Sequence, residues 1–101
     1  MMLENYDLEL FVVGGSAKAQ RAEVNLRRLC DDALAGRYEL RVIDVLENAE
    51  AAEAANIVAT PALLRKAPLP VRMIVGDLSE RRALAQGLGL EVDNEGRLTD
   101  E

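Results

Sequence analysis

The first apolar run along the chain predicts a β-strand. Residues 8–13 are apolar at every position but one, so both faces of the predicted strand are largely apolar. One face holds Leu8, Leu10 and Val12, and the other holds Phe11 and Val13. Strands with two apolar faces are typical of sheets that are covered on both sides.

The next segment, residues 17–34, changes to a helical period. Its apolar stripe recurs at steps of three and four residues and consists of Ala22, Leu26, Leu29 and Ala33, with Cys30 beside it. Ser16 is placed to cap the N-terminus of this helix, and Gly36 is placed to end it. Residues 38–46 predict a second strand, so the first half is expected to be a βαβ unit with two parallel strands.

The second half of the chain is patterned much more weakly. Residues 48–55 favour a short, loosely packed helix that begins at Asn48, whereas residues 62–66 show no clear period. A strand is predicted at 71–75, with Val71, Met73 and Val75 on one face. A last helix, residues 80–88, is expected to be capped by Ser79. The tail contains a turn signal at 93–96.

Charge is unevenly distributed along the 101 residues. The net charge is −6, and residues 91–101 hold five acids and one base. We therefore expect one domain over residues 1–90 and a flexible acidic tail over 91–101. Nucleic acids and anionic membranes attract basic surfaces, so neither is expected as a partner. No apolar run approaches the roughly 20 residues that span a bilayer.

The cysteine count and the N-terminal residues bear on location. Cys30 is the only cysteine, which excludes an internal disulfide and fits a reducing compartment. Residues 1–7 carry acids and no base, unlike a signal or transit peptide. A cytoplasmic protein is expected.

The chain lacks the residue combinations that common enzyme sites use. It has no histidine, and a lone cysteine supports neither a CxxC redox pair nor a structural zinc site. Gly14-Gly15 follows a strand, as in phosphate-binding loops, but the rest of those motifs is missing, so a tight turn is favoured. Asp44 and Cys30 are interpreted as a hydrogen-bonded acid at a strand end and an inert core residue. No catalytic residue, metal or cofactor is predicted, and the protein is not expected to be an enzyme.

The order of the predicted elements is that of a thioredoxin-like domain without redox cysteines at residues 14–17. On several sequence blocks the chain also resembles the KaiB family of circadian-clock proteins. These blocks are 10–14 (LFVVG), 21–22 (RA), 41–48 (RVIDVLEN), 59–63 (ATPAL) and 70–79 (PVRMIVGDLS), which follow the family's order over about residues 6–90.

The resemblance implies an α/β, KaiB-like or thioredoxin-like fold whose second half can adopt either of two packings. It also implies a non-enzymatic regulator that binds a KaiC-type hexameric ATPase, with a resting homotetramer or dimer. Lys18, Arg21 and Arg72 are the candidate partner-binding residues, since Arg21 and Arg72 match basic positions of the family. The fold-switch hinge is expected within residues 47–78, at Pro61, Pro68, Pro70, Gly76 and Asp77.

Two other kinds of protein share some of these sequence features. One is a KaiB-like, non-switching sensor module of a histidine kinase, which would make such a kinase a further partner. The other is a thiol oxidoreductase, which would require cysteines that this chain lacks.

Overall fold

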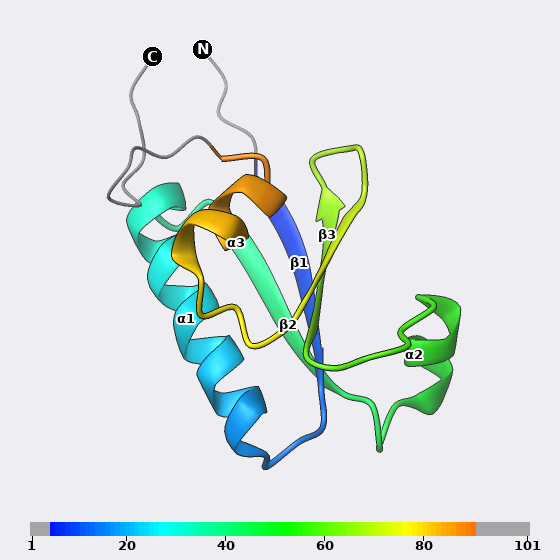
Figure 1. The fold of residues 1–101 in the computed structure, drawn as a ribbon. Coiled ribbons are helices and arrows are strands. Elements are labelled where there is room, and N and C mark those ends of the chain that lie inside the picture. Colours follow the sequence, from blue (N-terminus) through cyan, green and yellow to red (C-terminus); the bar gives the residue numbers. More distant parts are fainter. Residues whose placement is uncertain (1–4, 91–101) are drawn as a thin grey trace.

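A four-stranded sheet with three helices accounts for residues 5–90, the part of the chain that the computed structural model describes (Figure 1). In chain order the elements are β1 (Tyr6–Val12), α1 (Ala17–Leu34), β2 (Tyr38–Asp44), α2 (Ala49–Ala54), β3 (Ala62–Ala67), β4 (Arg72–Val75) and α3 (Arg81–Gly87). The expected acidic tail and its turn at 93–96 lie outside the described residues.

The strands are ordered β2-β1-β3-β4, so β1 lies inside the sheet, and β2 and β4 form its edges. β1 runs parallel to β2, with Leu10 opposite Val42. It runs antiparallel to β3, with Leu10 opposite Leu63. β4 pairs antiparallel with the far side of β3. The predicted βαβ unit with two parallel strands is therefore confirmed.

The core lies on the side of the sheet that α1 and α3 cover (Figure 1). Leu8, Leu10 and Val12 of β1 point into it, as the alternation along that strand predicts. Every residue of the predicted stripe on α1 is buried, and so is Cys30 beside it. The stripe consists of Ala22, Leu26, Leu29 and Ala33. Since each fully buried leucine contributes about 1.5–3 kcal/mol, this stripe accounts for much of the attachment of α1.

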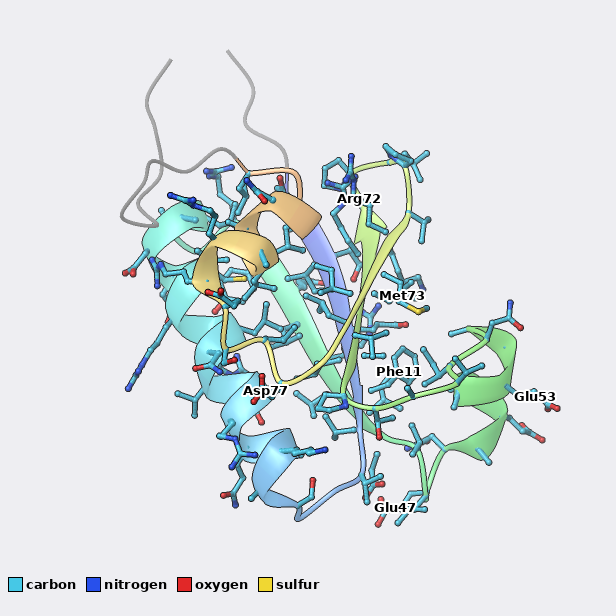
Figure 2. The ribbon with its side chains drawn as sticks, in the orientation of Figure 1. Phe11, Glu47, Glu53, Arg72, Met73 and Asp77 are labelled. Atoms are coloured by element: carbon cyan, nitrogen blue, oxygen red, sulfur yellow. The ribbon has the colours of Figure 1, made fainter. Side chains whose placement is uncertain are left out.

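The other face of the sheet is only partly covered. Phe11 is buried on this face, whereas Met73 is exposed on it, and both lie on the side of α2 (Figure 2). α2 itself has no buried residue, in agreement with the weak packing expected from its small side chains. Nearer the start of β1 the face becomes polar, because Arg41 forms ion pairs with Asp7 and Glu9.

The structure differs from the sequence prediction in two segments. β2 ends at Asp44 instead of residue 46, because the Asp44 carboxylate accepts a hydrogen bond from the N–H of Leu46 and turns the chain. Residues 62–66, which show no clear period, belong to β3.

The predicted cap of the last helix was wrong. α3 begins at Arg81 with Glu80 in the capping position, and Ser79 lies one residue too early to cap it. The N–H of Ser79 is instead donated to the Asp77 carboxylate at 3.1 Å. Asp77 therefore organises the approach to the helix rather than its first turn.

Candidate functional site

Two of the predicted partner-binding residues lie on the first turns of α1. This helix begins where the sequence predicts, because the Ser16 hydroxyl oxygen accepts a hydrogen bond from the N–H of Ala19 at 3.1 Å. Lys18 and Arg21 follow on the exposed side of the helix. Both cations are therefore carried by a well-anchored element and project into solvent.

The β4–α3 junction lies beside these turns of α1. Gly76 has a φ of 128°, a backbone conformation that residues with a side chain rarely adopt. Its N–H donates a hydrogen bond to the Pro61 carbonyl at 2.9 Å. Leu78 also has a positive φ, of 61°, and its side chain is buried. The Asp77 side chain therefore lies at the surface, between Gly76, which is held by its hydrogen bond to Pro61, and Leu78, which is held by burial.

Asp77 connects this junction to α1. Its carboxylate lies 3.8 Å from Nε of Arg21, and its backbone carbonyl accepts a hydrogen bond from Nδ2 of Asn25 at 3.1 Å. Hydrogen bonds from Ser79 to the carboxylate, and secondarily the charge of Arg21, lower the pKa of Asp77. The structure thus brings together Arg21, a predicted binding residue, and Asp77, a predicted hinge residue. Asn25 was missed because a single polar residue on a helix carries no such signal.

Arg72, the third predicted binding residue, is not part of this cluster. It begins β4, whereas Asp77 lies two residues beyond the end of that strand, and Figure 2 shows the two well apart. At about 3.3 Å a residue, the strand places their backbones on the order of 15 Å from each other. Lys18 and Arg21 therefore share a surface that Arg72 does not.

The predicted hinge prolines lie in the connections around β3. The peptide bonds that precede Pro61, Pro68 and Pro70 are all cis. Pro61 precedes β3 and accepts the hydrogen bond from Gly76, whereas Pro68 and Pro70 lie in the turn between β3 and β4. The described residues 5–90 show one packing, which is thioredoxin-like, so the hinge stays a prediction.

Cys30, Gly14 and Asp44, which were weighed as possible catalytic or phosphate-binding residues, have structural roles. Cys30 is fully buried, and burial raises the pKa of its thiol to about 12. A Cβ at Gly14 would clash with the Asp44 carboxylate, so the glycine makes room for that acid at the end of β2. Within residues 5–90 no cluster of three potential metal ligands is found, and no helix is long and apolar enough to cross a membrane.

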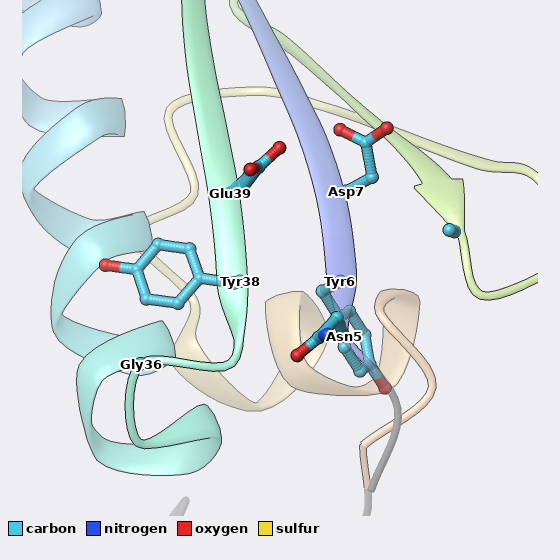
Figure 3. A pocket seen from close by; sticks show the side chains of 7 residues that line it. Asn5, Tyr6, Asp7, Gly36, Tyr38 and Glu39 are labelled. Carbon is cyan, nitrogen blue, oxygen red and sulfur yellow. The ribbon is translucent and has the colours of Figure 1, made fainter.

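A pocket of about 500 Å³ opens at the start of β1 and β2 (Figure 3). It is lined by Asn5, Tyr6, Asp7, Gly36, Tyr38, Glu39 and Ala67. The hydroxyl of Tyr38 points away from Asp7 and Glu39 of the pocket and donates a hydrogen bond to Asp31 at 2.7 Å. Asp7 forms an ion pair with Arg41. None of the predicted site residues lines this pocket.

The fold and these residues define a thioredoxin-like domain without the paired cysteines of a redox enzyme. The N-terminal domain of SasA from Synechococcus elongatus has a similar fold, with a TM-score of 0.71, 25% identity and 88% of each chain covered. Mitochondrial thioredoxin 3 from Saccharomyces cerevisiae aligns with a TM-score of 0.68 and 16% identity, covering 85% of this chain and 78% of that chain. The fold class expected from the sequence is confirmed.

Sequence comparison identifies the family. The family model described as KaiB domain matches residues 9–90. A protein named circadian clock oscillator protein KaiB, from Prochlorococcus marinus (strain MIT 9313), is 44% identical over 90 residues, covering 89% of this chain and 76% of that relative. One of the same name from Synechococcus elongatus (strain ATCC 33912 / PCC 7942 / FACHB-805) is 44% identical, covering 86% and 85%. The chain belongs to the KaiB family.

Proposed function

We propose that this protein is a non-enzymatic regulator that binds a KaiC-type hexameric ATPase and modulates its phosphorylation and ATPase cycle. The system it serves is a circadian clock or a clock-like timer. The observation that carries the proposal is the match to the KaiB family over residues 9–90, together with 44% identity to relatives named as clock oscillator proteins.

The surface of the domain supports a binding role. The chain is acidic overall, yet Lys18 and Arg21 are exposed next to each other in the fold, on the first turns of α1. Charges of this kind steer association and fix the register of two partners. Arg72 lies apart, and in this proposal it contacts a second part of the same large partner.

The proposal includes self-association and a change of packing. The resting form is a homotetramer or dimer, and the described thioredoxin-like form is one of two packings of residues 47–90. Asymmetry between the halves of the chain supports this, because the segments before residue 47 are strongly patterned and those after it are not. Switching stays part of the proposal and is tested separately from binding.

The test is binding to a purified KaiC-type hexamer. The full chain is titrated against the ATPase with ATP present, and affinity, ATP hydrolysis and phosphorylation are measured over hours, because a change of packing slows binding. We expect saturable binding and a changed rate of hydrolysis or phosphorylation. Absence of binding to the ATPase encoded by the same genome would overturn the proposal.

A second candidate is a non-switching sensor module of a histidine kinase. It is favoured by one observation, the likeness of the whole described chain to the N-terminal domain of SasA. The two candidates differ in solution. A sensor module keeps the thioredoxin-like packing at all times and binds its partner without a slow phase, whereas the regulator shows a second set of NMR signals.

A further inference from the structure

Arg65 is a cation in the interior of the domain. It lies on β3 with 4% of its surface exposed, between Leu64 on the outer face of the sheet and Lys66 at the surface. It points to the same side of the sheet as Leu63, which belongs to the core beneath α1 and α3. Burying an arginine is costly unless its N–H groups find acceptors, so its contacts need an explanation.

The acceptors of Arg65 are backbone carbonyls from two separate segments. Nη1 donates to the carbonyl of Leu88 at 2.6 Å, and Nη2 donates to the carbonyl of Pro70 at 2.7 Å. The guanidinium carbon also lies 5.9 Å from the centre of the Tyr6 ring. Within residues 5–90 no carboxylate forms an ion pair with it, and its Nε has no hydrogen-bond partner.

The two carbonyls belong to segments that no other described hydrogen bond joins. Leu88 is the C-cap residue that follows the last residue of α3, and the C-terminal end of a helix attracts a positive charge. Pro70 lies in the turn from β3 to β4. Gly89 leaves room for the guanidinium, because a Cβ there would lie 2.8 Å from Nη1, and the φ of this glycine is 85°.

We propose that Arg65 is an internal latch that holds the end of α3 and the β3–β4 turn to each other. A rigid, forked cation satisfies both carbonyls at once, whereas an ammonium group is a single point charge. Loss of the guanidinium leaves two inward-facing carbonyls without a donor, so both segments are expected to loosen together. The latch thereby makes the end of the last helix and the hairpin turn one cooperative unit. This inference rests on the described packing and not on the proposed partner.

The test compares Arg65→Met with the parent by amide exchange and ¹⁵N relaxation. Methionine fills a similar space without donors. We expect the amides of Leu88, Gly89 and Leu90 to exchange at least about tenfold faster, the loss expected when charged hydrogen bonds are removed. Order parameters at Leu69 and Val71 should fall in the same variant, from about 0.85 towards 0.6. Amides of β1 and α1 should keep their protection.

Arg72→Met is the matched control, because Arg72 is exposed and lies directly opposite Arg65 in the β3–β4 pair. It should leave both segments unchanged. If Arg65→Met does not fold, Arg65→Lys provides the same measurement with the charge kept, and the turn and the helix end should then loosen to different extents. Unchanged exchange and order in the Arg65 variant, loosening of only one segment in Arg65→Met, or an equal loss of protection throughout β1 and α1 would each overturn the latch.

Discussion

The carboxylate of Asp77 lies 3.8 Å from Nε of Arg21, although 56 positions of the sequence separate them. Asn25, one turn after Arg21 on α1, donates to the backbone carbonyl of the same aspartate at 3.1 Å. An exposed ion pair of this kind contributes little energy by itself, typically below about 1 kcal/mol. The contacts of Asp77 instead fix the position of the loop between β4 and α3 against α1, which carries Lys18 and Arg21.

The first prediction is that charge reversal at the basic positions weakens partner binding without unfolding the domain. Arg21→Glu and Arg72→Glu should each reduce affinity for the KaiC-type ATPase by about tenfold, since interface charges act in steering and register. Circular dichroism should show an unchanged fold, because both side chains are exposed. Arg28→Glu, an equal charge change on an exposed position of α1, is the control and should bind normally.

Separate single variants matter because Arg72 begins β4, whereas Arg21 lies on α1 next to Asp77, beyond the other end of that strand. If both single variants and the double variant bind like the parent, neither residue is part of the interface. If only Arg21→Glu is weakened, the binding surface is confined to the first turns of α1.

The second prediction concerns the titration of Asp77. Its pKa is lowered from the usual 3.8, first by hydrogen bonds from Ser79 and then by Arg21. A lowered folded-state pKa stabilises the fold above the unfolded-state pKa, and that contribution is lost as the pH falls through the folded-state pKa. Carboxyl ¹³C NMR should give a midpoint below 3.8. Ser79→Ala should raise this midpoint more than Arg21→Gln does; the reverse order would show that the ion pair dominates.

The third prediction is that Gly76→Ala disfavours the described packing. At a φ of 128° an L-residue is strained, and a Cβ there meets nothing within 4 Å, so the whole effect is conformational. Such strain costs on the order of 1–3 kcal/mol. Urea unfolding should show that loss, and NMR should show weaker thioredoxin-like signals if a second packing exists.

Gln86→Ala, on the exposed side of α3, is the control for the Gly76 variant and should stay within about 0.5 kcal/mol of the parent. A Gly76→Ala protein as stable as the parent would contradict the observed backbone at this junction. A destabilised variant with a single set of NMR signals would favour the non-switching alternative.

The sequence pattern predicts the elements in the first half of this fold and some of those in the second half. α1 matches its predicted range because its apolar stripe and its Ser16 cap are local signals. β3 was missed because Arg65 occupies an inward position, where an apolar residue would have completed the alternation. The sequence pattern predicts a cap at Ser79, but the hydrogen bond from its N–H to the Asp77 carboxylate depends on the folded path of the chain.

The candidate site shows the same limit. Exposed basic residues can be found in the sequence, so Lys18 and Arg21 were predicted, but the proximity of Arg21 to Asp77 depends on tertiary packing. For the same reason, sequence gave no sign that Arg72 lies apart from the other two. Prediction therefore identified candidate residues but not their grouping on the surface.

The fourth prediction is that Cys30 is inert in the folded protein. Burial raises the pKa of its thiol to about 12, so almost no thiolate is present at neutral pH. Reaction with Ellman's reagent should be at least about a hundredfold slower than in denaturant, where the pKa returns near 8.5. Gln20→Cys in a Cys30→Ala background supplies an exposed thiol on the same helix and should react at once. Fast labelling of the native parent would show that α1 opens readily.

The last prediction is self-association through the β4 edge and the turn before it. Leu63 of β3 is fully buried in the core, so it is not part of this surface. The exposed large apolar side chains in this region are instead Leu69, Val71, Met73 and Val75. Met73 and Val75 belong to the edge strand β4, and Leu69 and Val71 lie in the turn before it. The outer N–H and C=O groups of an edge strand are available for pairing with another strand. Sedimentation velocity at micromolar concentration should show a dimer or tetramer.

Val71→Lys with Met73→Lys should give monomers, because lysine on an edge strand opposes pairing. Val24→Lys, on an exposed position of α1, should associate like the parent. A parent that stays monomeric at every concentration would rule out association, and lysine variants that still associate would move the interface away from β4.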